Sequence, residues 1–331
     1  MISVRTPRIK IAPELGDASY HCITRTVNGE FLFDDVAKEV FRKQMRQVSE
    51  FCGLHIFDYT ILSNHIHILT RVPKKTELSD AELLRRYRVL YPRPTGHQTA
   101  RIEVIEQWLA TQHPHGVAWR QRMMALMGDV SPFMQLLKQR FSIWFNRNHN
   151  RYGTLWSQRF TSVLAESVQP VLLRMAPYID LNCVRAQLVG DPKDYRFCAY
   201  GEAVAGGREA QEGLCSLFGD NDWTRVQAAY RQILFSVGSD PRHKGATISQ
   251  ADFRRVIAEG GQLPLAEVLR CRVRYFTQGA VLGTRAFVEE QLAACRRKSG
   301  RRLAGAPYPL PPVTDWGELV SLRLPRGPAI G

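Results

Sequence analysis

The pattern of apolar and polar residues near the start of the chain predicts a strand followed by a helix. Residues 18–26 form a short β-type run with partial alternation. Asp34 or Asp35 can cap a helix that continues to about Cys52, and Gly53 suits the end of that helix. The apolar positions of this helix recur every three or four residues and form one buried face: Val40, Phe41, Met45, Val48 and Cys52.

The next segment, residues 54–72, shows the two-residue period of β-structure. It divides near Ser63 and Asn64 into two runs, so the order of elements is β-α-β-β. This order is typical of an α+β fold, and it suggests an antiparallel sheet with helices packed on one side.

After residue 72 the sequence predicts an insertion, then two further helices with a short strand between them. Residues 73–127 look like an insertion, with a capping box at Ser79 that opens one short basic helix. A strong helix is predicted over residues 131–148 and a short strand over residues 160–165. Pro170 opens a further helix, which Pro177 should kink or restart.

The composition changes after about residue 200, and this change predicts two regions. Residues 201–219 are rich in Gly and Ala and have the character of a linker or loose helix, whereas residues 223–235, 263–274 and 284–297 show helical patterns. We therefore expect a catalytic-type α+β domain over residues 1–204, including the insertion, and a mostly α-helical C-terminal extension with a basic, Pro-rich tail over residues 205–331.

Charge gives the first indication of function. The 331 residues include 45 Lys and Arg against 31 Asp and Glu, which gives a formal net charge of +14. Basic proteins often bind polyanions, and nucleic acid is the commonest of these. Five of the basic residues lie between positions 138 and 159, where no acidic residue occurs: Lys138, Arg140, Arg147, Arg151 and Arg159. This segment is the best candidate for contacts with DNA phosphates.

Cysteine spacing and hydropathy indicate the compartment. The seven cysteines are dispersed and none shows C-x-x-C spacing, which argues against a disulfide framework and against a structural zinc site. No apolar stretch approaches the roughly 20 residues of a membrane helix, and the first ten residues lack the apolar core of a signal peptide. We therefore expect a cytoplasmic protein that does not enter a membrane.

Two histidines on one predicted strand form the sharpest local motif. In His65-Ile66-His67 the imidazoles project from one face of the strand while Ile66 points into the core. Two imidazoles on a rigid strand provide half of a metal site, although a chance His-x-His on a half-exposed strand has the same pattern. A histidine-triad hydrolase would need another His at position 69, which is Leu69, and a zincin would place its pair four apart on a helix.

A second group of polar residues lies on the predicted helix that follows Pro170. Tyr178 and Asn182 are four residues apart and share a face, with Arg174 and Arg185 on roughly the same side. A phenol can attack phosphorus when cations lie close to it. The alternative is a tyrosine at a domain interface with its hydroxyl group hydrogen-bonded.

At these residues the sequence resembles the single-tyrosine HUH transposases of the IS200 type, and most closely the REP-associated tyrosine transposases. The resemblance rests on ordered segments over about residues 8–204, less the insertion: SYHCITRTVNGEFLFDD, LSNHIHILT, LLKQRFSIWFNRNHNRYGTLWSQRF, YIDLNCVRAQLV and DPKDYRFCAY. It implies an HUH, ferredoxin-like or RRM-like core. The family usually has Asn-Pro-Val where this chain has Asn182-Cys183-Val184, and Pro177 directly before the tyrosine is unusual.

The resemblance also implies an activity and the residues that perform it. Tyr178 would be the nucleophile, and His65, His67 and the amide oxygen of Asn182 would bind Mg²⁺ or Mn²⁺. The enzyme would cut single-stranded DNA beside a REP-like palindromic hairpin, form a 5′-phosphotyrosine and pass the strand to another 3′-OH, with no nucleotide cofactor. Trp156 or Phe160 could stack on an unpaired base. The phosphate contacts would come from the basic residues between positions 138 and 159, with Arg174 and Arg185.

Other functions remain compatible with the sequence. The chain could be a non-catalytic DNA-hairpin-binding protein that keeps the transposase fold, a relaxase-like replication initiator, or a metal-dependent hydrolase that acts through water. Relaxases often carry paired tyrosines, and no second Tyr lies one helical turn from Tyr178. The sequence is equally compatible with a monomer and a homodimer.

Overall fold

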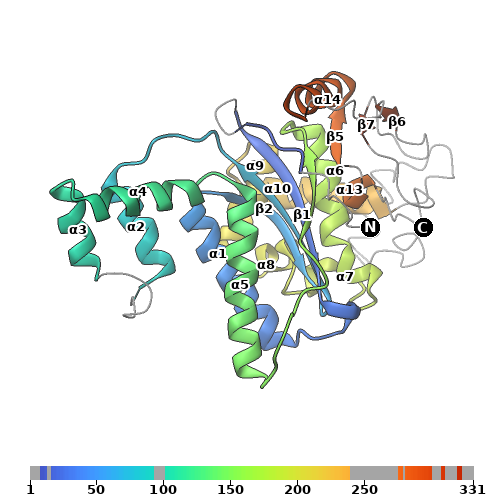
Figure 1. Ribbon diagram of the computed structural model, residues 1–331. Coiled ribbons are helices and arrows are strands. Elements are labelled where there is room, and N and C mark those ends of the chain that lie inside the picture. The colour runs from blue at the N-terminus through green and yellow to red at the C-terminus, as the bar shows by residue number, and fades with distance from the viewer. Residues whose placement is uncertain are drawn as a thin grey trace, which may run out of the picture.

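A mixed β-sheet lies at the centre of the computed structural model, which describes residues 8–12, 16–92, 101–238, 275–278, 280–299, 307–309 and 319–322 (Figure 1). Within these ranges the sheet has seven strands in the order β2-β3-β1-β4-β5-β7-β6. All neighbours are antiparallel except β4 and β5, which are parallel. The strands are β1 (Ala18–Arg25), β2 (His55–Ile61), β3 (His65–Val72), β4 (Thr161–Ala165), β5 (Val281–Thr284), β6 (Tyr308–Pro309) and β7 (Leu319–Ser321).

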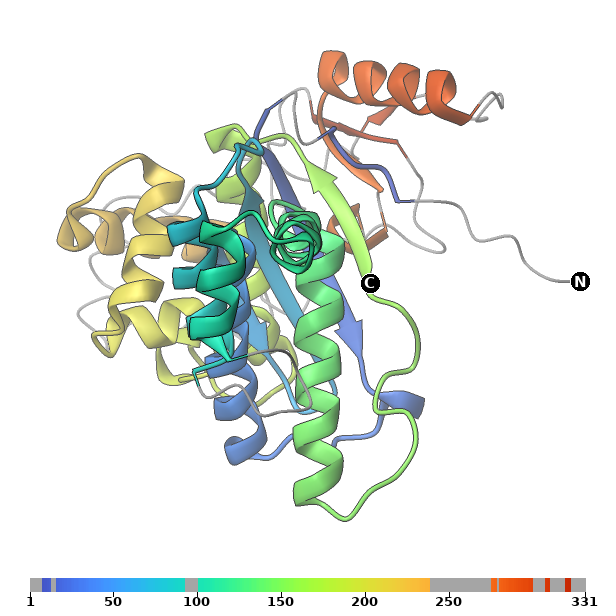
Figure 2. The same cartoon turned by 60° about the vertical axis from the view of Figure 1, so that its left-hand side comes forward.

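Two long helices, α1 (Asp35–Cys52) and α5 (Val130–Asn148), lie side by side on one face of the sheet (Figures 1 and 2). The predicted β-α-β-β order and the predicted ends of α1 are confirmed. The Asp34 carboxylate accepts a hydrogen bond from the Ala37 amide at 2.7 Å, and Gly53 ends the helix in the left-handed region with a φ of 71°. Aromatic rings of both helices form the core between them, with Phe41 and Phe141 at a centroid distance of 5.0 Å.

The other face of the sheet is also covered, so helices do not pack on one side only. Helix α6 (Gln169–Asp180) lies across β2 and β3, and it is followed by the short α7 (Asn182–Arg185) and a 3-10 turn (Pro192–Asp194). Strand β1 is buried at seven of its eight residues, because both faces of the sheet are covered there; the His21 ring, for example, meets the ring of Tyr178 from α6. This second face is where His21 and His67 lie.

Three further helices close the fold beyond the β2 edge. These are α8 (Ala199–Val204), α9 (Arg208–Phe218) and α10 (Trp223–Gly238), so the region expected to be a linker or loose helix is mostly regular helix. Helix α9 approaches the backbone of β2 very closely, since a Cβ atom at Gly213 would lie 2.6 Å from the Ile56 carbonyl oxygen. Helix α10 packs on both α6 and α9.

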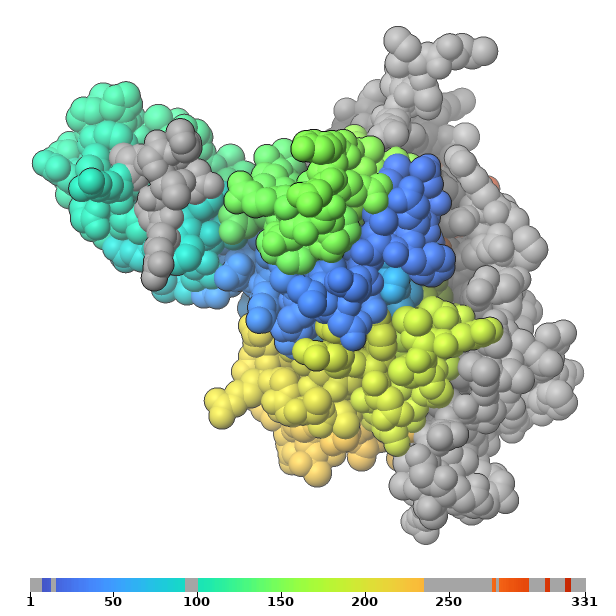
Figure 3. Space-filling model, turned by 90° about the horizontal axis from the view of Figure 1, so that it is seen from below, coloured from blue at the N-terminus to red at the C-terminus, as the bar shows by residue number. Residues whose placement is uncertain are grey.

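The insertion forms a helical lobe that projects from the sheet domain (Figures 1 and 3). Over residues 73–92 and 101–127 the structure describes α2 (Asp80–Leu90), α3 (Ile102–Ala110) and α4 (Pro114–Leu126), whereas the sequence predicted one helix only. The predicted cap is confirmed, because the Ser79 hydroxyl oxygen accepts from the Glu82 amide at 3.2 Å. The lobe has its own aromatic core, in which the rings of Tyr87 and Trp119 lie 5.5 Å apart.

The C-terminal extension adds strands as well as helices. Besides α13 (Tyr275–Gln278) and α14 (Arg285–Ser299), it supplies β5, β6 and β7, which extend the sheet beyond β4. The Glu166 carboxylate after β4 accepts from the Thr284 amide at 2.7 Å and so fixes the end of β5. The helix predicted over residues 263–274 lies outside the described residues. No helix within the described ranges is long and apolar enough to cross a membrane.

Candidate functional site

Three imidazoles gather on the face of the sheet that α6 covers. Strand pairing places His67 of β3 opposite Ile23 of β1, so that His21, two residues before Ile23, lies diagonally beside His67. The rings of His21 and His67 stack at a centroid distance of 5.1 Å. The ring centroids of His65 and His67 are 5.2 Å apart. Ile66 is fully buried on the opposite face, as the alternation predicts.

Burial keeps these imidazoles neutral. It lowers the pKa of His21 to about 4 and that of His65 to about 3, with nearby Arg25 adding to the effect at His65. The pKa of His67 is lowered well below its ordinary value, first by burial and then by the neighbouring His21. A neutral imidazole is the form that donates a lone pair to a metal ion.

Hydrogen bonds determine which ring nitrogen of His65 carries the lone pair. The Asn64 side-chain amide nitrogen donates to the Gly29 carbonyl oxygen at 3.1 Å, so its oxygen faces His65. That oxygen lies 2.6 Å from His65 Nδ1, which must therefore carry the proton. Nε2 of His65 is left with the lone pair, as a metal ligand requires.

The candidate nucleophile lies directly against the histidines. The Tyr178 ring, on α6, meets the rings of His21 and His67 edge-on, each at a centroid distance of 6.2 Å. It also packs against Phe276 of α13 at 5.0 Å, and only 8% of Tyr178 is exposed. Helix packing thus brings together His67 and Tyr178, which are far apart in the sequence.

The helix around Tyr178 differs from the prediction in one respect. Helix α6 runs through Pro177 and ends at Asp180, so the break lies after the tyrosine rather than at the proline. The Asn182 side-chain nitrogen donates to the carbonyl oxygens of Tyr178 and Ile179 at 2.9 and 3.1 Å, which bridges the break. With its nitrogen used in this way, the amide oxygen of Asn182 is the part of the side chain that can accept a hydrogen bond or bind a metal.

Buried polar contacts hold the tyrosine helix in place. The Thr60 hydroxyl of β2 donates to the Ile179 carbonyl oxygen at 2.7 Å. Asp180 accepts from the Tyr230 hydroxyl of α10 at 2.6 Å and from the Tyr200 amide at 3.1 Å. Burial raises the pKa of Asp180 to about 6. These bonds tie α6 both to the sheet and to the helices behind it.

Arg185 belongs to the interior of the site. Its guanidinium donates to the Tyr178 carbonyl oxygen at 2.7 Å and lies 4.7 Å from the centre of the Tyr178 ring. The side chain is buried, so its positive charge acts on the phenol at short range. Arg174, one turn before the tyrosine, is half-buried on α6.

His65, His67 and Asn182 are the residues that the sequence predicts as ligands of a divalent metal. Among the described residues there is no cluster of three or more His, Cys, Asp or Glu side chains suited to a metal ion. His65 and His67 lie side by side with ring centroids 5.2 Å apart, and Asn182 begins α7 directly after the tyrosine helix. Neutral imidazoles are ligands for divalent transition metals, and a side-chain amide oxygen is a donor of the kind that suits Mg²⁺ and Mn²⁺.

The five basic residues of α5 and of the loop before β4 divide into two groups. Lys138 donates to the Gln158 carbonyl oxygen at 2.8 Å, Arg140 donates to the Leu90 carbonyl oxygen at 3.2 Å, and Arg151 pairs with Glu30 at 3.2 Å. Burial lowers the pKa of Lys138 to about 8, with Arg8 adding to the effect. Arg147 and Arg159 are exposed. Three of the five predicted DNA contacts thus already hold the loop or the insertion in place.

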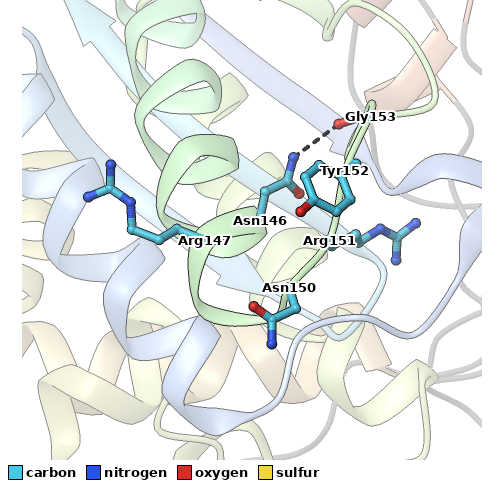
Figure 4. Close-up of a pocket in the computed structure, with 6 residues that line it drawn as sticks. All are labelled: Asn146, Arg147, Asn150, Arg151, Tyr152 and Gly153. Atoms are coloured by element: carbon cyan, nitrogen blue, oxygen red, sulfur yellow. Dashed lines mark hydrogen bonds between the residues drawn. The ribbon is translucent and has the colours of Figure 1, made fainter.

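A shallow pocket of about 420 Å³ lies where α5 passes into the loop before β4 (Figure 4). The Asn146 side-chain nitrogen donates to the Gly153 carbonyl oxygen at 3.1 Å across this pocket. Its lining is polar and basic, and it includes one aromatic ring: Asn146, Arg147, Asn150, Arg151, Tyr152 and Gly153.

The exposed aromatics on this side are not those the sequence suggested for stacking. Trp156 and Phe160 are 8% and 7% exposed, and Trp156 Nε1 donates to the Ser142 hydroxyl at 2.8 Å, so both rings belong to the core. Tyr152 and Phe31 are 93% and 82% exposed instead. Composition alone could not distinguish buried from exposed rings, because an aromatic residue in a basic segment can lie either in the core or on the surface.

Comparison with known proteins gives a family match for the first part of the chain and one similar solved structure. Residues 15–83 match the sequence model of the family described as transposase IS200 like, which confirms the suspected resemblance over that segment. The match spans β1, α1, β2 and β3, with His21, His65 and His67, and it ends before Tyr178. Among solved structures, a REP-associated tyrosine transposase bound to a REP hairpin is similar, with 14% identity, a TM-score of 0.38, and coverage of 62% of this chain and 87% of that one. No curated protein matches the chain.

Proposed function

We propose that this protein is a metal-dependent tyrosine transposase that cuts and rejoins single-stranded DNA through a 5′-phosphotyrosine. The observation that carries the proposal is the position of Tyr178, whose ring lies against the imidazoles of His21 and His67 at 6.2 Å. This contact supports the proposal because the candidate nucleophile lies beside the candidate metal ligand His67, with the Arg185 guanidinium over the tyrosine ring.

The chemistry follows from these residues. His65, His67 and Asn182 would hold Mg²⁺ or Mn²⁺, and the bound ion would offset negative charge on the phosphate. The Tyr178 hydroxyl oxygen forms a bond to phosphorus and loses its proton, while the bond from phosphorus to the 3′ oxygen breaks and that oxygen gains a proton. Arg185 favours the developing phenolate because its positive charge lies over the ring.

Strand transfer is the reverse of the first step. A different 3′-OH attacks the phosphotyrosine, and the phenol leaves with its proton restored. The energy of the original phosphodiester is kept in the protein–DNA ester, so the reaction needs no nucleotide cofactor.

The DNA partner we propose is single-stranded DNA that carries a REP-like palindromic hairpin. Support for this partner comes from the net charge of +14, from exposed Arg147 and Arg159, and from the hairpin bound by the similar solved transposase. Tyr152 in the pocket of Figure 4 and nearby Phe31 offer exposed rings on which unpaired bases can stack.

The test is covalent capture. The full-length protein is incubated with Mn²⁺ and single-stranded hairpins taken from the sequence flanking its gene, and the products are separated on a denaturing gel. We expect a protein–DNA adduct that forms only with Mn²⁺ or Mg²⁺, and mass spectrometry of the digested adduct should place the nucleotide on Tyr178. Cleaved DNA with no adduct would instead indicate hydrolysis by water.

A second function, hairpin binding without cleavage, is favoured by the burial of Tyr178. Only 8% of this residue is exposed and Phe276 packs against it, so DNA has to displace part of this packing to reach the hydroxyl group. Tight binding of hairpin DNA with neither cleavage nor adduct under all metal conditions would support this alternative.

The exposed arginines give a prediction about salt dependence. Replacing Arg147 and Arg159 together with alanine is expected to weaken hairpin binding and to reduce the slope of log Kd against log salt by about 0.7 for each lost single-strand phosphate contact. Filter binding over a range of NaCl concentrations measures this slope. Arg225→Ala is the matched control, since it removes the same kind of charge from α10, where Arg225 pairs with Asp220. An unchanged slope in the double variant would place the DNA elsewhere.

A further inference from the structure

A chain of two hydrogen bonds connects the metal-ligand candidate His67 to the C-terminal extension. His21 Nδ1 lies 2.7 Å from the Phe276 carbonyl oxygen, and His21 Nε2 lies 2.9 Å from His67 Nδ1. The three residues come from α13, β1 and β3. All are buried, with 1% of Phe276, none of His21 and 2% of His67 exposed.

This chain leaves one arrangement of protons. A carbonyl oxygen only accepts, so His21 Nδ1 must donate to Phe276. A neutral imidazole carries a single proton, so His21 Nε2 has a lone pair and accepts from His67. His67 Nδ1 is therefore protonated, and its Nε2 carries the lone pair. An imidazolium at His21 would be a buried cation, which is costly without a carboxylate partner.

We propose that His21 is a positioning residue for the metal site, and that with the Phe276 carbonyl it holds His67 in the tautomer that presents Nε2 to the metal. This inference rests on the proposed function, in which His67 is a ligand. Partners of this kind fix the orientation of ligand histidines and raise their basicity, and their loss typically costs 10- to 100-fold in metal affinity. Asn64 fixes the tautomer of His65 in the same way, through its side-chain oxygen 2.6 Å from His65 Nδ1. Each of the two candidate ligands therefore has a hydrogen-bond partner at Nδ1.

The inference also gives the C-terminal extension a role at the site. Phe276 contributes its carbonyl to the histidine chain and its ring to Tyr178, at a centroid distance of 5.0 Å. Phe276 of α13 thus contacts both the histidine chain and the candidate nucleophile. The metal site of this chain is complete only with a residue from beyond position 204.

The test measures Mn²⁺ binding by the full-length protein without DNA, from the loss of the electron paramagnetic resonance signal of free Mn²⁺. His21→Leu removes the acceptor for His67 and is expected to weaken binding 10- to 100-fold. His21→Gln keeps an oxygen near the position of Nε2 and should bind within about 3-fold of the wild type, because a comparable acceptor remains. His55→Leu, on the exposed start of β2, is the control and should bind normally.

A spectroscopic readout separates positioning from simple stability. In protein labelled with ¹⁵N at histidine and free of metal, His67 should show a protonated Nδ1 and an unprotonated Nε2 in the wild type and in His21→Gln, and a mixture of tautomers in His21→Leu. A wild-type His67 protonated at Nε2 overturns the inference even if no variant folds. Unchanged Mn²⁺ affinity in a folded His21→Leu also overturns it.

The outcomes also distinguish this inference from the proposed function. If Mn²⁺ binding depends on His21 but no DNA adduct forms, the positioning role stands and the transposase chemistry fails. If the adduct forms and His21 variants bind Mn²⁺ normally, the chemistry stands and the positioning role fails. A wild-type protein that binds no Mn²⁺ overturns both.

Discussion

Replacing Tyr178 with phenylalanine is expected to abolish the covalent DNA adduct and to lower strand cleavage by at least about 10³-fold, since removal of a nucleophile typically costs this much or more. The substitution removes one oxygen atom and keeps the ring. The edge contacts to His21 and His67 at 6.2 Å and to Phe276 at 5.0 Å all involve the ring, so the packing should be retained. Loss of activity with normal folding would therefore report the hydroxyl group itself.

The measurement is a single-turnover cleavage assay with a 5′-labelled hairpin, together with hairpin affinity and thermal unfolding for each variant. Tyr195→Phe and Tyr152→Phe are the controls. The Tyr195 hydroxyl donates to the Ile61 carbonyl oxygen at 2.7 Å in the core, and Tyr152 is 93% exposed beside the basic pocket. An adduct that persists in Tyr178→Phe and disappears in Tyr152→Phe would move the nucleophile to the loop.

Local sequence signals predicted the core of the fold well. The cap at Asp34, the glycine at position 53 and the alternation through His65 and His67 act within a few residues, and the structure has each of them where the pattern indicated. Such features can be predicted because they depend on backbone geometry within a few residues and not on distant parts of the chain.

Features that depend on partners far along the chain were missed. His21 has the same alternating pattern as any half-buried strand residue, and only the register of β1 against β3 places it beside His67. Phe276 lies 255 residues from His21, and no local signal links the two. The strands of the C-terminal extension are two to four residues long and become visible only through their pairing with β4 and with one another.

The sequence also could not predict which individual basic side chains are available to bind DNA. Lys138, Arg140 and Arg159 look equivalent as basic residues of one segment, yet Lys138 and Arg140 reach carbonyl oxygens of their own protein while Arg159 is exposed. The excess charge indicated a polyanion. Packing then decided which charges are available to bind it, because an ammonium or guanidinium group that already donates to a carbonyl oxygen has fewer donors for phosphate.

Replacing His65 with alanine is expected to lower cleavage by at least about 10²-fold, because loss of one ligand weakens both metal binding and the stabilisation of phosphate charge. His65 is a better choice than His67 for this test. The His67→Ala change would leave the buried His21 Nε2 without its partner at 2.9 Å, and an unsatisfied buried group costs about 1–3 kcal/mol of stability. His65 is partly exposed, and its side-chain bond is to the neighbouring Asn64.

Hairpin affinity, measured in EDTA, should change less than about 3-fold in His65→Ala, because exposed Arg147 and Arg159 are the proposed phosphate contacts and they act independently of the metal. His55→Ala is the control for loss of an imidazole from the same sheet. Raising the Mn²⁺ concentration should partly restore cleavage, since a weakened site fills by mass action. Full cleavage by His65→Ala at low Mn²⁺ would remove this histidine from the site, whereas a parallel loss of hairpin binding would assign it to DNA recognition instead of chemistry.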